Sequence, residues 1–142
     1  MSTYTQILYQ IVFSTKNRRN TLVKTHQDDL YRDIWGILKN KNCHLYRING
    51  VENHLHILTH VHPTTSLSNL IKDIKLGSSD FIKKHQSFPG FKGWQQGYAA
   101  FTYTITEKKR LITYIKNQQK HHEIVTYKEE LIGLLNEHNI AF

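Results

Sequence analysis

Two histidines in the most regular stretch of the chain are the first candidates for chemistry. Residues 51–62 alternate with a period of two, and in a strand the two sets of side chains point to opposite faces of a sheet. One set is mostly apolar and is expected to face the core, which places His54 and His56 side by side on the other face. Two imidazoles at this spacing can share one divalent metal ion. A half-exposed strand with solvated histidines is the alternative, and the pattern alone leaves both open.

A tyrosine and a glutamine form the second candidate pair. A helix is expected from about residue 107 to 120, and within it Tyr114 and Gln118 lie one turn apart on a single face. A phenol attacks a phosphodiester when a metal ion neutralises the non-bridging oxygens and the phenol loses its proton. The carbonyl oxygen of Gln118 is a hard ligand that suits Mg²⁺ or Mn²⁺. Without the histidine pair, an ordinary amphipathic helix would be the favoured interpretation.

The rest of the chain contains the elements that could position these residues. Alternation and helical spacing of apolar residues predict strands at 4–14, 44–48, 51–62 and 98–104, and helices at 26–41, 66–84, 107–120 and from 126 onward. Asn49-Gly50 indicates a hairpin turn before the histidine strand. Thr25 with Asp28 and Thr126 with Glu129 resemble helix starts. The segment 77–79, Gly-Ser-Ser, indicates a bend in the second helix or the close approach of another backbone.

This order of elements, βαββαβ followed by two helices, predicts an α+β protein with a ferredoxin-like sheet. In that fold two helices pack on one face of the sheet, so the two histidines are expected on the other face. A C-terminal helix, from the same or another subunit, could cover them. The length favours a single domain over residues 1–142.

The composition favours a polyanionic partner. Nineteen lysines and arginines stand against eleven acidic residues, and eight tyrosines, two tryptophans and six phenylalanines could stack on bases. A merely basic protein is the alternative. The single Cys43 excludes an intramolecular disulfide framework and fits a reducing cytoplasm. No apolar run approaches the ~20 residues that cross a bilayer, and no signal peptide is recognisable, so we expect a soluble cytoplasmic protein.

At this point the residues resemble a known family. His54-Leu55-His56 resembles a His-hydrophobe-His (HUH) motif, and Tyr114 to Gln118 resembles the Tyr-x-x-x-Gln helix of single-tyrosine transposases of the insertion-sequence 200/605 type. This group includes the transposases associated with repetitive extragenic palindromes. The resemblance spans nearly the whole chain. Its flanking segments are 12–19, Val-Phe-Ser-Thr-Lys-Asn-Arg-Arg; 75–79, Lys-Leu-Gly-Ser-Ser; 94–98, Trp-Gln-Gln-Gly-Tyr; and 118–122, Gln-Gln-Lys-His-His.

The resemblance implies a DNA transposase that cuts and rejoins single-stranded DNA at the foot of hairpins. It implies that Tyr114 is the nucleophile, giving a 5′-phosphotyrosine link and a free 3′-hydroxyl, and that His54, His56 and Gln118 bind Mg²⁺ or Mn²⁺. Members of the family are homodimers in which the tyrosine helix of one subunit can complete the histidine site of the other. Assembly in cis or in trans stays open here. The resemblance implies no nucleotide cofactor, because the covalent link preserves the bond energy for rejoining. It also implies no association with a membrane.

Other polar residues are assigned from their positions. Many relatives have Asp just before the first motif histidine, where this chain has Asn53, and we expect Asn53 to act on the turn or on a ligand's orientation. The remaining histidines near the two motifs, His60, His62, His121 and His122, are interpreted as structural or solvated. Candidates for phosphate contacts, with solvated surface charges as the alternative, are Lys16, Arg18, Arg19, Lys72 and Lys75.

Two other functions compete with DNA strand transfer. One is a domesticated relative that binds hairpin DNA without cutting it, and the intact histidine, tyrosine and glutamine motifs argue against it. The other is a ferredoxin-like RNA-binding domain, which needs exposed aromatic side chains on the two central strands. The histidines of strand 51–62 argue against that function. Metal-dependent covalent capture of DNA separates the transferase from both.

Overall fold

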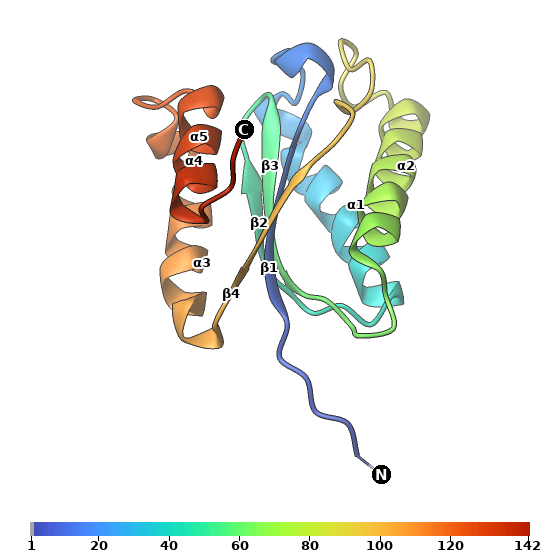
Figure 1. The fold of residues 1–142 in the computed structure, drawn as a ribbon. Helices are drawn as coiled ribbons and strands as arrows, with labels where there is room; N and C mark the ends of the chain where they lie inside the picture. The colour runs from blue at the N-terminus through green and yellow to red at the C-terminus, as the bar shows by residue number, and fades with distance from the viewer. Residues whose placement is uncertain (1) are drawn as a thin grey trace.

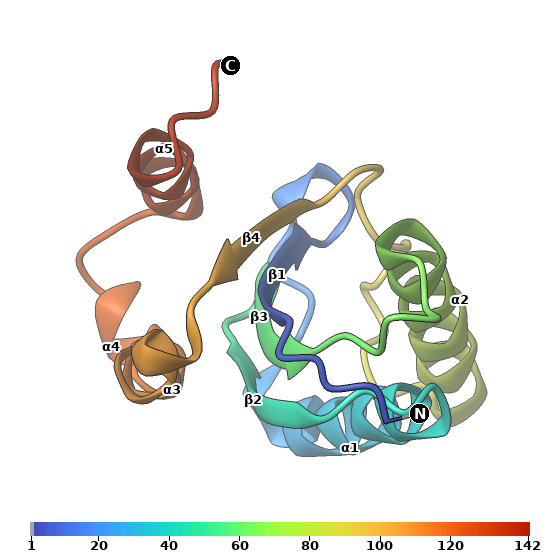
Figure 2. The same ribbon diagram turned by 60° about the horizontal axis from the view of Figure 1, so that its bottom comes forward.

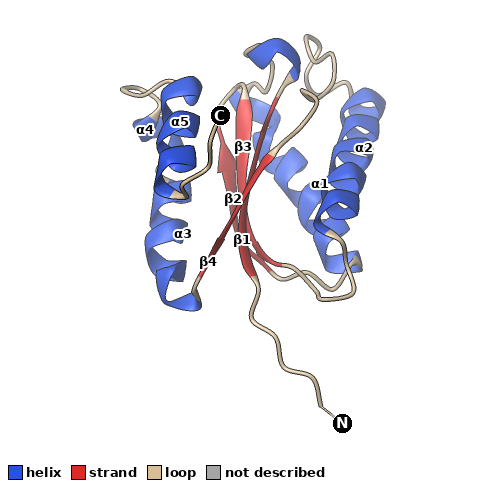
Figure 3. Cartoon of the chain, viewed as in Figure 1, coloured by secondary structure: helices blue, strands red, loops and turns tan. Residues whose placement is uncertain are grey.

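A four-stranded antiparallel sheet lies at the centre of the protein, between two layers of helices (Figures 1 and 3). The computed structural model describes residues 2–142. The strands are ordered β2-β3-β1-β4, which with the βαββαβ succession confirms the predicted ferredoxin-like fold. The strands are β1 (Leu8–Ser14), β2 (Leu45–Gly50), β3 (His54–His60) and β4 (Ala99–Tyr103). The helices are α1 (Gln27–Asn40), α2 (Leu67–His85), α3 (Lys108–Lys116), α4 (Gln118–His121) and α5 (Tyr127–Glu137).

Helices cover both faces of the sheet, as the view from below makes clear (Figure 2). Helices α1 and α2 lie on one face, and α3, α4 and α5 lie on the other. The predicted apolar side of β3 packs with the first layer, where Leu55 and Ile57 belong to the main core. On the opposite side, Leu58 packs with Leu111 and Ile115 of α3. Because the second layer covers this side, His54 and His56 are fully buried, and they are not solvated histidines of a half-exposed strand.

The second layer begins with a helix that ends earlier than predicted. The expected helix 107–120 is divided into α3 and α4 at Asn117, whose backbone is not helical. The amide Nδ2 of Asn49 on β2 donates to the carbonyl oxygens of Ile115 and Lys116, at 2.9 and 3.1 Å. A side chain that satisfies the last carbonyl groups of a helix stabilises its end. Asn49 therefore fixes where the tyrosine helix stops and where the short helix with Gln118 begins.

Two local predictions from the sequence are wrong, and a third is confirmed. Asn49 and Gly50 are the last residues of β2 rather than the hairpin turn, which lies at 51–53. Thr25 lies within a 3₁₀ turn and does not cap α1. The predicted start of α5 is confirmed, because Thr126 and Glu129 form a capping box.

Gly50 allows β2 and β3 to approach each other closely. A Cβ atom at this position would overlap the carbonyl oxygen of His54 and lie 2.8 Å from Leu55 Cδ2. We expect Gly50→Ala to lower the free energy of unfolding by about 1–3 kcal/mol, as overpacking does. Gly36→Ala in α1 is the matched control: its Cβ meets no atom within 4 Å, and alanine favours the helix by about 1 kcal/mol. Urea unfolding of both variants tests this, and equal stabilities would contradict it.

Candidate active site

Four side chains that are far apart in the sequence form a buried cluster on the α3–α5 side of the sheet. His54 and His56 come from β3, His122 follows α4, and Glu130 comes from α5. Their ligand atoms all lie within 4.8 Å of one another. The Glu130 oxygen Oε1 lies 3.2 Å from His54 Nε2, 2.8 Å from His56 Nε2 and 3.1 Å from His122 Nε2. The two strand histidines have no exposed side-chain area and Glu130 only 2%, so the cluster is closed to bulk solvent.

In each histidine of the cluster, the Nδ1 atom contacts an oxygen atom outside the cluster. This arrangement places the proton of each neutral ring on Nδ1 and leaves the Nε2 lone pair directed at the centre of the cluster. Asn53 therefore orients the ring of His54. The contacts are His54 Nδ1 with Asn53 Oδ1 at 2.7 Å, His56 Nδ1 with Gln10 Oε1 at 2.8 Å, and His122 Nδ1 with the carbonyl oxygen of Val125 at 2.7 Å.

The charges of the cluster follow from burial and from its hydrogen bonds. Burial lowers the pKa of His54 to about 4, so this ring is neutral at pH 7. Burial would raise the pKa of Glu130, but its close contacts with the imidazoles of His122, His54 and His56 outweigh this effect and hold that pKa well below its usual value. Neutral imidazole and ionised carboxylate are the forms that coordinate a metal cation.

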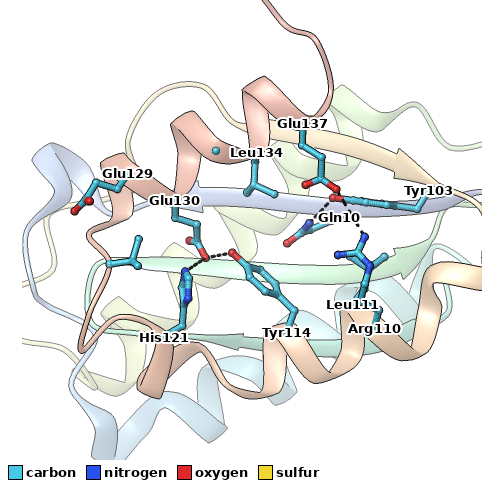
Figure 4. A pocket seen from close by; sticks show the side chains of 12 residues that line it. Gln10, Tyr103, Arg110, Leu111, Tyr114, His121, Glu129, Glu130, Leu134 and Glu137 are labelled. Carbon is cyan, nitrogen blue, oxygen red and sulfur yellow. Dashed lines mark hydrogen bonds and ion pairs between the residues drawn. The ribbon is translucent and has the colours of Figure 1, made fainter.

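The other carboxylate oxygen of Glu130 contacts the predicted nucleophile (Figure 4). The Tyr114 hydroxyl donates a short hydrogen bond to Glu130 Oε2. Gln118 Nε2 donates to the same oxygen at 3.1 Å, and His121 Nε2 lies 3.4 Å from it. The Tyr114 ring packs edge-on against His56, with centroids 5.8 Å apart. One chain therefore brings together all four residues that the two sequence motifs singled out.

Tyr114 is protonated in this environment. Burial raises the pKa of its phenol, and the adjacent Glu130 carboxylate raises it further. A phenol of this kind becomes a nucleophile only when a cation stabilises the phenolate.

A cavity of about 270 Å³ opens beside Tyr114 and Glu130 (Figure 4). Tyr103 lies on its wall and accepts a hydrogen bond from Gln10 Nε2 at 3.0 Å. Gln10 in turn contacts His56, so a chain of polar contacts runs from the cavity wall to the histidine cluster. Burial raises the pKa of Tyr103 to about 12, so its phenol also remains protonated.

Two of the basic residues predicted to bind DNA are already engaged within the protein. Lys75 Nζ donates to the carbonyl oxygens of Gln95 and Gly97, at 2.9 and 2.5 Å. The Arg18 guanidinium lies 5.0 Å from the centre of the Tyr127 ring. The other three, Lys16, Arg19 and Lys72, are exposed.

A second cavity, of about 570 Å³, lies beside the basic loop 16–19 and reaches Gln96, Tyr98 and Tyr127. Tyr127 stacks on the ring of His54, with centroids 4.3 Å apart. This basic and aromatic cavity therefore shares a wall with the histidine cluster.

Two residues of the cluster were missed from the sequence. From the sequence, His122 is expected to be structural or solvated, and Glu130 belongs to neither motif. The sequence contains one signal for Glu130, because its helical spacing places it on the same buried face of α5 as Tyr127 and Leu134. A glutamate on the buried face of a helix requires a hydrogen-bond donor, a positive charge or a metal ion as its partner in the protein interior. For His122 the sequence contains no such signal.

Comparisons with known proteins agree with the geometry. The family model described as "Transposase IS200 like" matches residues 3–118. A candidate transposase from Deinococcus radiodurans R1 has a similar structure, with a TM-score of 0.65 and 21% identity over 83% of this chain and 95% of that one. A REP-associated tyrosine transposase bound to a REP hairpin also has a TM-score of 0.65, with 17% identity over 88% of this chain and 76% of that one. No curated protein matches by sequence. At these identities the two structures show a shared fold.

Proposed function

Because the chain belongs to the family of IS200-like transposases, we propose that it cuts and rejoins single-stranded DNA at hairpin ends through a covalent tyrosine intermediate. The observation that carries this proposal is the contact of the Tyr114 hydroxyl with Glu130, the carboxylate of the histidine cluster. Tyr114 thus lies beside a group of side chains that could bind a metal ion. The REP-associated neighbour is bound to a DNA hairpin, which supports hairpin DNA as the substrate.

The cutting step exchanges one phosphodiester bond for another. The phenolic oxygen of Tyr114 attacks the scissile phosphorus, and the bond from phosphorus to the 3′-oxygen breaks. The downstream strand is then attached to Tyr114 through its 5′-phosphate, and the upstream strand leaves with a free 3′-hydroxyl. In rejoining, a 3′-hydroxyl attacks the phosphotyrosine and releases the phenol. No nucleotide hydrolysis is required, because the number of phosphodiester bonds is unchanged.

The protein residues fit a divalent metal ion at this site. Of the buried side-chain atoms that lack a hydrogen-bond partner within residues 2–142, His54 Nε2 and Gln118 Oε1 lie in this site, and a bound ion is one way to satisfy such atoms. His54, His56 and Gln118 would hold the ion, with Mg²⁺ or Mn²⁺ as the family resemblance implies. When bound, it supplies a Lewis acid that neutralises charge on the scissile phosphate. Glu130 and Gln118 hold Tyr114 in place, and Glu130 Oε2 is positioned to accept the phenolic proton.

Single-stranded DNA is proposed to reach the site along the basic and aromatic cavity. Arg18 and Tyr127 line that cavity next to His54, and aromatic rings beside cations suit stacked bases and phosphates. Lys16, Arg19 and Lys72 are proposed phosphate contacts, whereas Lys75 positions the loop that contains Gln95. Within residues 2–142 no helix is long and apolar enough to cross a membrane.

Denaturing electrophoresis tests the proposal. The protein is incubated with end-labelled single-stranded DNA that contains a hairpin from its own genomic flanks, with Mg²⁺, with Mn²⁺ or with chelator. A metal-dependent, protease-sensitive band of reduced mobility is expected. Hairpin binding without any such band, across several flanking hairpins, would indicate a DNA-binding relative that does not cut.

The protein is also proposed to be a homodimer, but with each active site built from one chain. Tyr114 contacts Glu130 and His56 of its own chain. A mixture of the Tyr114→Phe and His56→Ala variants should therefore form no covalent DNA complex, because neither chain contains a complete site. Recovery of about a quarter of the wild-type yield, after the subunits are allowed to exchange, would instead place the tyrosine in trans. Light scattering measures the dimer itself.

A further inference from the structure

We infer that His122 and Glu130 are metal ligands that form, with His54 and His56, a centre of three imidazole nitrogens and one carboxylate oxygen, in place of the set of His54, His56 and Gln118 that the family resemblance implies. The donor set of this centre favours a transition-metal ion over Mg²⁺. The inference deepens the proposed function and rests on it only for the use of the ion in DNA cutting. The ion itself can be measured without DNA.

The first argument is that four hydrogen-bond acceptors face one another in the cluster. His122 Nδ1 contacts a backbone carbonyl oxygen, which cannot donate, so the proton of the neutral ring lies on Nδ1 and Nε2 carries a lone pair. The rings of His54 and His56 have the same orientation toward amide oxygens. Three ring nitrogens therefore lie 2.8–3.2 Å from one carboxylate oxygen, and all four atoms lie within 4.8 Å of one another. In a buried site this is unfavourable unless a cation lies among them.

The second argument is the spacing of the donors. Zinc–nitrogen bonds of about 2.0 Å in a tetrahedral site separate neighbouring ligand atoms by about 3.3 Å. The distances from Glu130 Oε1 to the three Nε2 atoms are only a few tenths of an ångström shorter. The Nδ1 atom of each imidazole also contacts an oxygen atom, as the second ring nitrogen of a metal-binding histidine usually does.

The donor types decide which ion is preferred. Imidazole nitrogen suits Zn²⁺ and other transition-metal ions, whereas Mg²⁺ prefers oxygen ligands and retains several waters. Here three of the four donors are nitrogen, and the site is closed to bulk solvent. We therefore expect tight binding of Mn²⁺, Co²⁺ and Zn²⁺ and weak binding of Mg²⁺.

Glu130 links the ion to the nucleophile. Its Oε1 faces the three histidines, and its Oε2 accepts the Tyr114 hydrogen bond. Occupation of the centre would thus fix the carboxylate that positions the phenol. It would also tie α5 to β3, so metal binding should raise the temperature of unfolding.

Calorimetry and thermal unfolding of the full chain, without DNA, test the inference with Mn²⁺, Co²⁺, Zn²⁺ and Mg²⁺ as probes. One transition-metal ion per chain is expected. Glu130→Gln and His122→Ala should each weaken its binding at least about 10- to 100-fold and reduce the rise in unfolding temperature. Glu129→Gln is the matched control, since Glu129 is the adjacent carboxylate and its side chain hydrogen-bonds to Thr126 rather than to the histidines. A glutamine side chain fits the space of Glu130, and its amide can donate to a histidine Nε2 atom of the cluster. The Glu130→Gln variant should therefore fold.

The outcomes separate the inference from the proposed function. Unchanged transition-metal affinity in folded Glu130→Gln and His122→Ala, or equal affinity of the wild type for Mg²⁺ and Mn²⁺, would overturn the inference, even if DNA is cut. Metal binding that depends on both residues, with no covalent DNA complex under any metal, would instead support the centre and overturn the proposed transposase chemistry.

Discussion

Tyr114→Phe should abolish the covalent protein–DNA complex and strand cleavage, with a loss of at least about 10³-fold in rate, as expected when a nucleophile is removed. Phenylalanine keeps the ring that packs against His56 and removes only the oxygen that would attack phosphorus. The half-buried phenol donates to Glu130, so its loss leaves one carboxylate oxygen with fewer donors. The effect on stability should be small, at about 1 kcal/mol.

The measurement is single-turnover cleavage of labelled hairpin DNA, with hairpin binding measured in parallel. Binding should be unchanged, because the phenol is not proposed to contact the hairpin. Tyr46→Phe is the matched control, since this tyrosine packs against the same apolar cluster as Tyr114. If Tyr114→Phe still cuts DNA at a rate close to that of the wild type, Tyr114 is not the nucleophile.

His56→Ala should weaken metal binding by at least about 100-fold and eliminate metal-dependent cleavage. His56 is fully buried between Gln10 and Glu130, and its Nε2 is the histidine nitrogen closest to the carboxylate. Its removal takes one donor from the centre and leaves Gln10 Oε1 and Glu130 with one partner fewer. Unsatisfied buried groups of this kind cost about 1–3 kcal/mol each, so the variant should also unfold more easily.

Isothermal titration with Mn²⁺ measures the first effect, and urea unfolding measures the second. His62→Ala is the matched control, because His62 follows the same strand and its imidazole hydrogen-bonds to Thr64, outside the cluster. Metal affinity should be unchanged in that control. A His56→Ala protein that is folded and binds Mn²⁺ as the wild type does would remove the histidine pair from the metal centre.

Most of the fold could be predicted from the sequence because its elements show clear periodicity. The alternation of β3 separated the core side, with Leu55 and Ile57, from the side of the two histidines. The exceptions are local. Asn49 and Gly50 favour a turn, but here Asn49 is needed as the donor that ends α3, and Gly50 is needed where β3 approaches β2. Tertiary contacts of this kind override turn propensity and cannot be seen in a short window of sequence.

The candidate site was only partly predictable for a related reason. His54, His56, Tyr114 and Gln118 lie within two short motifs, so their spacing alone indicated a shared site. His122 and Glu130 lie in the segment after the second motif, and their contact with β3 depends on how α5 packs across the sheet. The capping box of Thr126 and Glu129 predicted where α5 begins, but not which of its two adjacent glutamates points inward.

The most direct test of the central claim is to identify the protein atom that becomes linked to DNA. The denatured complex is digested with nuclease and trypsin and analysed by mass spectrometry. The account predicts a 5′-linked nucleotide on Tyr114, the only tyrosine in the tryptic peptide Leu111–Lys116. Label at the 3′ end of the DNA should accordingly remain with the protein, and label at the 5′ end should not. A nucleotide on Tyr103 or Tyr127, or a link through a 3′-phosphate, would contradict the account.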